Sequence, residues 1–262
     1  MRIDVLSVLP RMVEEAFREG VVGRAIEAGV LEFKVWNLRD FAEGKYQQTD
    51  DAPFGGGAGM VMKPEPILKG VRAIREDADV EPLKVLLTPQ GRLFDQATAR
   101  RFSRAPRMLL ICGRYEGVDE RVRDHLVDRE VSVADVVVSG GEIPALLVID
   151  AVARRVPGVL GAEDSLAEES FDDGLLEYPQ YTRPRDFRGW GVPPVLLSGD
   201  HGAVARWRRG ERVRRTRQRR PDLLAGADLS EHERAALAEP GAGPGDAGTG
   251  PAGGLDPSAP DP

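Results

Sequence analysis

The chain has one cysteine, Cys112, and three histidines that are scattered singly along the sequence. A lone cysteine inside an apolar stretch has no disulfide partner, which indicates a reducing compartment and a place in the core rather than a nucleophile. Histidines without a second histidine or cysteine at ligand spacing do not predict a zinc site. We therefore expect no metal site built by the protein, and any metal ion to be weakly held.

The sequence also lacks an apolar run of roughly 18 residues, the length that a membrane-spanning helix needs. Its first residues lack the basic region and apolar core of a signal peptide. These features predict a cytoplasmic protein with no membrane partner. Of its 262 residues 41% are hydrophobic, enough for one large or two moderate domains. The net charge of -7 argues against a protein that coats nucleic acid with its whole surface, although it can hide a local basic patch.

Strand-like and helix-like segments alternate through the first 160 residues. Period-two patterns and short branched apolar runs predict strands, and longer amphipathic patterns predict helices. The predicted strands are 1–10, 31–36, 84–87, 108–112 and 136–138, and the predicted helices are 10–20, 24–28, 64–77, 95–102 and 143–156. This alternation is typical of an α/β fold with a mostly parallel sheet.

Three of the predicted strands end in turns that contain glycine. Gly113 follows 108–112, Gly140 and Gly141 follow 136–138, and the turn 88–91 follows 84–87. Taken singly, each glycine is typical of an ordinary tight turn. However, ligands of open α/β sheets lie outside the carboxyl ends of the strands, and the first turn carries an unusual number of ionisable side chains. We therefore predict a binding pocket where these turns meet.

Residues 50–60 contain a further glycine-rich segment, with four glycines in five positions at 55–59. Such a segment cannot form regular structure without a large entropic cost, which predicts a mobile loop. It lacks the Lys-Ser/Thr pair of a phosphate-binding P-loop. Two interpretations stay open: a flexible connection, or a loop that closes over a substrate with Asp50 and Asp51 as hydrogen-bond acceptors.

The composition changes near residue 160. Residues 161–174 are acidic and poor in large apolar side chains, which indicates a linker between domains. Within the next part, residues 206–220 contain nine arginines and one glutamate. A solvated helix face is one explanation, but arginines beside a tryptophan suit phosphate contact and base stacking, so we expect RNA binding. The last residues, 239–262, have the composition of a disordered tail.

Six motifs occur in a fixed order along the chain: DDAPFGGGAGMVMKPEP, LTPQGRLFDQ, ICGRYEGVDERV, VSGGEIPALLVIDAVARRVPGVLG, EYPQYTRP and VPPVLLSGDH. Together they resemble the bacterial tRNA (guanine-N1)-methyltransferases of the SPOUT superfamily, from Met1 to about residue 237. The resemblance implies a trefoil-knotted methyltransferase domain at 1–160, an acidic linker at 161–174 and a small helical tRNA-binding domain at 175–238. Unthreaded connections are the general rule, so the pattern of residues alone predicts an unknotted sheet.

The resemblance also implies that S-adenosylmethionine binds at the glycine-containing turns, mainly through backbone groups. The implied cofactor-binding residues are Leu87, Pro89, Gly113, Tyr115, Ser132, Val133, Ala134, Asp135, Val136, Val137, Val138, Gly140, Gly141 and Pro144. Where many relatives have Gly-Asp-Tyr-Val-Leu, this chain has Ala-Asp-Val-Val-Val at 134–138. Backbone contacts can survive this change, whereas the missing tyrosine and the added alanine methyl group could lower cofactor affinity.

Methylation of guanine N1 requires a base, because N1 carries a proton in the neutral form. A positioned and partly desolvated carboxylate can accept this proton, and an arginine can stabilise the negative charge that develops on O6. The resemblance implies Arg154 as the arginine and Glu169 as the base, where the family has an aspartate. Glu116 is implied to shape the guanine pocket. The alternative carboxylates are Asp164, Glu168, Asp172 and Asp173.

The resemblance further implies a homodimer whose active site is shared between the subunits, with magnesium assisting the reaction. The implied activity is methyl transfer to N1 of the guanosine at position 37 of tRNA, next to the anticodon. Two alternatives stay open. One is a related SPOUT methyltransferase that acts on another RNA, and the other is a non-catalytic RNA-binding protein that has lost cofactor binding.

Overall fold

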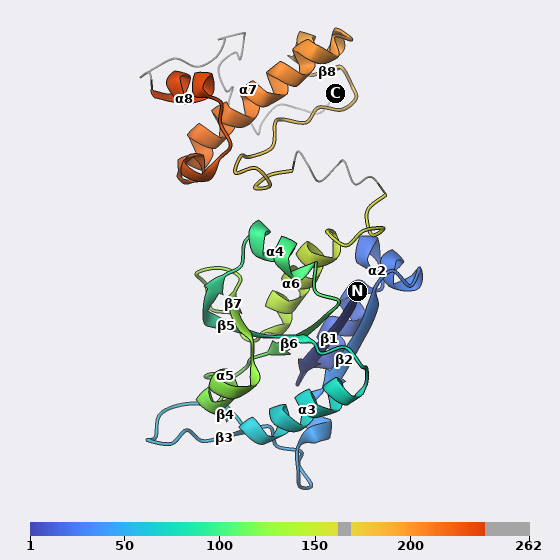
Figure 1. The fold of residues 1–262 in the computed structure, drawn as a ribbon, viewed down its shortest axis with the longest axis vertical. Coiled ribbons are helices and arrows are strands. Elements are labelled where there is room, and N and C mark those ends of the chain that lie inside the picture. Colours follow the sequence, from blue (N-terminus) through green and yellow to red (C-terminus); the bar gives the residue numbers. More distant parts are fainter. Residues whose placement is uncertain (162–168, 239–262) are drawn as a thin grey trace. The chain divides into compact units, whose positions relative to one another are not determined.

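The computed structural model describes residues 1–161 and 169–238 (Figure 1). The chain divides into two compact units, Met1–Leu166 and Ala167–Pro262. The predicted tail at 239–262 and two of the alternative carboxylates, Asp164 and Glu168, lie outside the described residues.

The first unit is built around a five-stranded sheet in the order β2-β1-β6-β5-β7, in which every pair of neighbours is parallel. The strands are β1 (Arg2–Ser7), β2 (Glu32–Asn37), β5 (Leu83–Leu93), β6 (Arg107–Cys112) and β7 (Arg129–Ser132). A separate antiparallel pair consists of β3 (Asp50–Asp51) and β4 (Val61–Met62). The predicted α/β class with a mostly parallel sheet is confirmed, and the trefoil knot stays a prediction.

Helices cover both faces of this sheet (Figure 1). They are α1 (Pro10–Glu14), α2 (Gly20–Glu27), α3 (Pro64–Glu76), α4 (Gln96–Phe102), α5 (Glu120–Leu126) and α6 (Glu142–Ala153). Side chains of α1, α2, α4 and α6 belong to one core cluster, and those of α3 and α5 to the other. Because strand side chains alternate between faces, β6 contributes Met108 and Leu110 to the first cluster and Leu109 and Ile111 to the second. Its unbroken apolar sequence follows from burial on both faces.

One predicted strand, 136–138, is wrong. The strand that occupies this edge of the sheet is β7, and the three valines lie in an irregular segment where Val137 is 85% exposed. The preference of valine for strands depends on a neighbouring strand and on burial, which these residues lack. The strand predicted at 84–87 continues to Leu93, with a break in register between Leu87 and Arg92. The predicted turn at 88–91 is therefore an irregularity within β5.

The described part of the second unit contains the α-helices α7 (His201–Arg219) and α8 (Glu231–Ala238), and a short hairpin of β8 (Asp186–Phe187) and β9 (Trp190–Gly191). Its small core consists of Leu175, Val213, Ala227 and Leu229. The side chain of Asp200 caps α7 by accepting a hydrogen bond from Ala203 N at 2.9 Å. None of the helices in the described ranges is both long and apolar enough to cross a membrane.

Candidate active site

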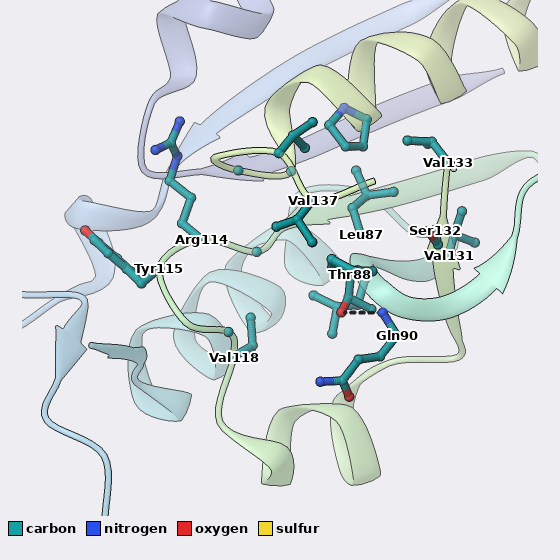
Figure 2. A pocket seen from close by; sticks show the side chains of 18 of the residues that line it. Leu87, Thr88, Gln90, Arg114, Tyr115, Val118, Val131, Ser132, Val133 and Val137 are labelled. Carbon is teal, nitrogen blue, oxygen red and sulfur yellow. Dashed lines mark hydrogen bonds between the residues drawn. The ribbon is translucent and has the colours of Figure 1, made fainter. Parts of the chain in front are cut away.

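A cavity of about 350 Å³ opens at the break in β5 and beyond the ends of β6 and β7, beside the first turn of α6 (Figure 2). Four chain segments contribute most of its wall: 86–90, 113–118, 131–133 and 136–141. All of the predicted cofactor residues line the cavity except Ala134 and Asp135, and Glu116 lines it as well. Segments far apart in the sequence thus meet where the sequence pattern predicted a pocket.

Several residues of the wall were not among the predicted cofactor-binding residues. They include Thr88, Gln90, Arg114, Val118, Glu120, Arg123, Val131 and Ser139. Most are direct neighbours of predicted residues in the same turns, so the turns taken whole would have found them. Glu120 and Arg123 are different, because both lie on α5.

The close approach of α6 to β6 explains the glycine at the start of this helix. Gly141 N donates a hydrogen bond to Gly113 O at 2.8 Å. A Cβ atom at Gly141 would come within 2.7 Å of Cys112 Cα and 2.9 Å of Gly113 N. No larger side chain fits between the two backbones, so the geometry of the cavity floor depends on this glycine.

A buried carboxylate, that of Glu142, lies behind the turn that follows β6 at the cavity. The Glu142 side chain is 1% exposed and accepts hydrogen bonds from Ser7 Oγ at 2.6 Å and from Arg114 Nε at 3.0 Å. The three residues come from the end of β1, the turn after β6 and the start of α6. Their contacts fix these segments relative to one another.

Arg123 connects three elements at the side of the cavity. Its Nε donates a hydrogen bond to Glu130 on β7 at 2.8 Å, and its Nη1 donates to Glu120 at 3.1 Å and to the Gln90 side chain. Thr88 Oγ1 accepts a hydrogen bond from Gln90 N at 3.3 Å (Figure 2). The cavity therefore has a charged, hydrogen-bonded rim, and leucine and valine side chains contribute apolar surface to its wall.

Tyr115 lies at the edge of the cavity in an unusual backbone conformation. Its φ of 60° is in the left-handed region, which residues other than glycine rarely adopt, and its side chain is 45% exposed. Such strain persists only where surrounding contacts enforce it, and it is concentrated at functional sites. The turn has these contacts, because Gly117 N donates to Arg114 O at 3.2 Å.

The glycine-rich loop meets the cavity at Glu116. Glu116 N donates a hydrogen bond to Met60 O at 3.0 Å, and Met62 N donates to Gly117 O at 2.9 Å. Gly59 has a φ of +81°, and a Cβ atom there would collide with the Glu116 side chain. The end of the loop is therefore packed against the first turn, which favours the interpretation that it closes over a substrate.

The other two predicted catalytic residues do not line the cavity. Arg154 caps the C-terminal end of α6, whereas the cavity lies at the N-terminal end of this helix. Because α6 has 12 residues, its two ends are about 18 Å apart. Glu169 belongs to the second unit. Among the alternative carboxylates, Asp173 is paired with Arg212 and Arg209.

Two further predictions concern Cys112 and metals. Cys112 is fully buried beneath the cavity floor, and burial raises the pKa of its thiol well above the ordinary value, so it is unsuited to act as a nucleophile. Within residues 1–161 and 169–238, no group of three or more His, Cys, Asp or Glu side chains is placed to hold a metal ion.

Two sets of arginines on α7 differ in their surroundings. Arg209, Arg212 and Arg214 form ion pairs with acidic side chains of the second unit. In the part of the chain that the structure describes, no carboxylate lies within ion-pair distance of Arg206, Arg215, Arg217 or Arg219. These four positive charges are therefore not neutralised by carboxylates within ion-pair distance.

Comparisons with known proteins give one consistent result. The family model described as tRNA (guanine-1)-methyltransferase TrmD matches residues 1–226. A tRNA (guanine-N(1)-)-methyltransferase of Symbiobacterium thermophilum is 54% identical over 237 residues, covering 89% of this chain and 96% of the relative. Enzymes of the same name from Dictyoglomus turgidum and Dehalococcoides mccartyi are 51% and 48% identical, and each match covers 91% of this chain and 96% of the relative.

Proposed function

Because the chain belongs to the tRNA (guanine-1)-methyltransferase family and so methylates N1 of guanine in tRNA, we propose that its cofactor, S-adenosylmethionine, binds in the cavity of the first unit. The observation that carries this proposal is the convergence of the predicted cofactor residues on one cavity. Its volume lies within the range of about 300–1,000 Å³ that is usual for small-molecule sites. Apolar side chains such as Leu87 and Val137 suit an adenine ring, and the charged rim suits the polar ends of the cofactor.

The reaction needs three tasks from the protein. S-adenosylmethionine supplies a methyl group on a positively charged sulfur, and the guanine must present N1 without its proton. We propose that Glu169 accepts this proton, that Arg154 stabilises the charge on O6, and that Glu116 shapes the guanine pocket. The position of Glu116 beside the end of the glycine-rich loop supports its role, since a guanine there would be enclosed by both segments.

We further propose that the enzyme is a homodimer in which Arg154 acts on the cavity of the partner subunit. The separation of about 18 Å along α6 supports this, because one chain does not bring Arg154 to its own cavity. Exposed apolar side chains near the cavity provide a surface for the partner: Ile143 and Leu147 on α6 are 54% and 47% exposed, and Met12 on α1 is 42% exposed.

Subunit mixing tests the shared site. An Arg154→Ala variant and a Gly141→Ala variant should each be nearly inactive alone, because one lacks the arginine and the other lacks the cavity. Refolded together, they form heterodimers with one intact site, which restores about a quarter of the wild-type activity if subunits pair at random. Activity that stays at the level of the separate variants would show that each site is built within one chain.

The activity itself is tested by methyl transfer from labelled S-adenosylmethionine to a tRNA transcript with guanosine at position 37. A twin transcript with adenosine at this position is the control. We expect label in the first only, at N1 of that guanosine. Label at another nucleotide would move the target elsewhere in RNA. An absence of both transfer and heat of binding with S-adenosylhomocysteine would support the non-catalytic RNA-binding alternative.

The role of Glu169 is tested by Glu169→Gln, with Asp172→Asn as the matched control in the same segment. Loss of the carboxylate should lower turnover at every pH, because no other group replaces the proton acceptor. The control should keep near-normal turnover. A Glu169→Gln variant with unchanged turnover across the pH range would remove this residue as the base.

The second unit is the proposed tRNA-binding part, supported by the uncompensated arginines of α7. Replacing Arg215 and Arg219 by glutamine should raise the KM for tRNA and reduce its dependence on salt concentration.

We propose the cytoplasm as the location, since tRNA is the substrate. Magnesium is proposed as an assisting ion, but the described residues offer no ligand set, so we assign it no step; a chelator titration of methyl transfer tests its requirement.

A further inference from the structure

The segment that carries Glu169 is a folded turn rather than an extended connection. Phe171 N donates a hydrogen bond to Leu175 O at 2.8 Å, and Glu177 N donates to Ser170 Oγ at 2.9 Å. Together with a bond from Asp172 N to Glu169 O at 3.4 Å, these bonds close residues 169–177 on themselves. The turn begins directly at the proposed base, so whatever holds it also limits where Glu169 can lie.

An ion pair holds this turn to α7. The Asp173 carboxylate accepts hydrogen bonds from Arg212 Nη2 at 2.5 Å and Nη1 at 2.9 Å. Arg209 Nη1 donates a further bond to Asp173 at 3.3 Å. The Arg212 side chain is 8% exposed and that of Asp173 is 29% exposed, so water screens the pair only partly. Removal of Asp173 would leave the buried Arg212 charge without its partner, which strongly destabilises a folded protein.

A second contact holds the 169–177 segment to α7 at Thr216, which lies one helical turn after Arg212. Leu176 N donates a hydrogen bond to Thr216 Oγ1 at 2.8 Å, and the Thr216 hydroxyl donates to Arg212 O at 2.7 Å. Thr216 and Leu175 are both fully buried, and Leu175 packs with Val213 in the core of this unit. Polar and apolar contacts therefore fix the same turn to the same face of α7.

The structure of Gly174 agrees with this close fit. Its φ is +82°, and a Cβ atom there would come within 2.7 Å of Ala227 Cα. The backbone of the turn consequently lies directly against the segment between α7 and α8, where Asp228 N donates to Asp173 O at 3.2 Å.

We propose that Asp173 is a positioning residue that fixes the 169–177 turn to α7, so that Glu169 moves as one body with the arginines of this helix. The inference rests on the proposed role of Glu169 as base. Arg215, Arg217 and Arg219 lie on the same helix as Arg212 and Thr216. Binding of tRNA along α7 then places the base together with the substrate, and Asp173 acts on turnover through Glu169.

Asp173→Asn tests this role, because it keeps the shape of the side chain and removes its charge. We expect kcat to fall about 10- to 100-fold, the effect of a displacement near 1 Å at a reacting group. The KM for tRNA and the affinity for S-adenosylhomocysteine should change little. Asp222→Asn is the matched control: Asp222 pairs with Arg220 at the exposed end of α7, and its loss should leave turnover near normal.

A kinetic cycle with Glu169→Gln separates positioning from general destabilisation. If Asp173 acts through Glu169, then Asp173→Asn has no further effect on kcat once Glu169 is glutamine. A loss of equal size in both backgrounds overturns the inference. Normal turnover of Glu169→Gln alone overturns the proposed base and the inference with it, whereas a slow Glu169→Gln beside a normal Asp173→Asn overturns the inference only.

The second contact offers an independent pair of variants in case Asp173→Asn does not fold. Thr216→Val keeps the shape of the buried side chain but removes the acceptor of Leu176 N, and Thr216→Ser keeps the hydroxyl. We expect kcat to fall in the first and to be restored in the second. Equal turnover of the two variants, both folded by circular dichroism, would contradict a role for this attachment in catalysis.

Discussion

Arg114 and Glu142 form an ion pair under the cavity, with 3.0 Å between Arg114 Nε and Glu142 Oε2. Glu142 stands at the first position of α6, where a negative charge is also favoured by the helix dipole. The Ser7 hydroxyl supplies a further hydrogen bond. Because Arg114 lines the cavity while Glu142 is buried behind it, the pair links the position of α6 to the turn after β6, where we propose that the cofactor binds.

The first prediction follows from this pair. Glu142→Ala leaves Arg114 without its buried partner and should lower the free energy of unfolding by about 3 kcal/mol. It should also weaken binding of S-adenosylhomocysteine, because the turn after β6 loses its support. Glu142→Gln, which can still accept the Ser7 hydrogen bond, should lose less. Urea unfolding and titration calorimetry measure both effects, and unchanged values for the alanine variant would contradict them.

The second prediction concerns Gly141. A methyl group at this position would meet the backbone of Cys112 and Gly113, so Gly141→Ala should separate α6 from β6 and abolish cofactor binding. Gly161→Ala is the matched control, because a Cβ atom there has nothing within 4 Å. Calorimetry with S-adenosylhomocysteine distinguishes them. Normal binding by the Gly141 variant would show that the cavity floor is not needed in this form.

Local signals in the sequence were sufficient to predict the cavity. Gly113, Gly140 and Gly141 could be identified because a glycine at the end of an apolar run is readable without knowledge of the fold. The position of Val137 could not, since a valine run forms a strand only where the sheet has a free neighbour, and β7 already takes that edge.

Contacts between residues far apart in the sequence could not be predicted either, because they too depend on which elements become neighbours in the folded chain. Arg123 contributes to the rim only because α5 brings it to Glu130 on β7 and to Gln90 on β5, and these pairings depend on the folded topology. The place of Arg154 at the far end of α6 follows from helix length, which the pattern predicted to within a few residues. The distance of Arg154 from the cavity could not be predicted, because it also depends on the cavity lying at the N-terminal end of α6.

The third prediction concerns Cys112. Since burial raises the pKa of its thiol and the side chain is fully covered, a maleimide should label the native protein very slowly and the urea-unfolded protein completely. Methyl transfer should be unchanged after treatment of the native enzyme. Mass spectrometry of both samples measures the labelling. Rapid labelling of the native form would mean that the strands around the cavity floor open frequently.

The fourth prediction is a pH dependence in the second unit. Hydrogen bonds from Arg209 Nε at 2.7 Å, together with those from Ser230, lower the pKa of Glu233 from 4.5 to about 2. A carboxylate whose pKa is lower in the folded state stabilises the fold above its unfolded pKa, and this contribution disappears as the pH falls through the folded value. The contribution should therefore be complete above about pH 4.5 and lost by about pH 2.

Scanning calorimetry of the full chain and of Glu233→Gln measures this contribution as a difference in Tm. We expect the wild type to be the more stable by a constant margin from pH 7 to about 5, and the margin to shrink between about pH 4.5 and 2, because only the wild type loses a paired charge there. Glu231→Gln, an exposed change on the same helix, should show no such trend. A difference in Tm that is independent of pH would mean that Glu233 stabilises α8 through packing and neutral hydrogen bonds. The ion pair between Glu233 and Arg209 would then contribute nothing measurable to stability.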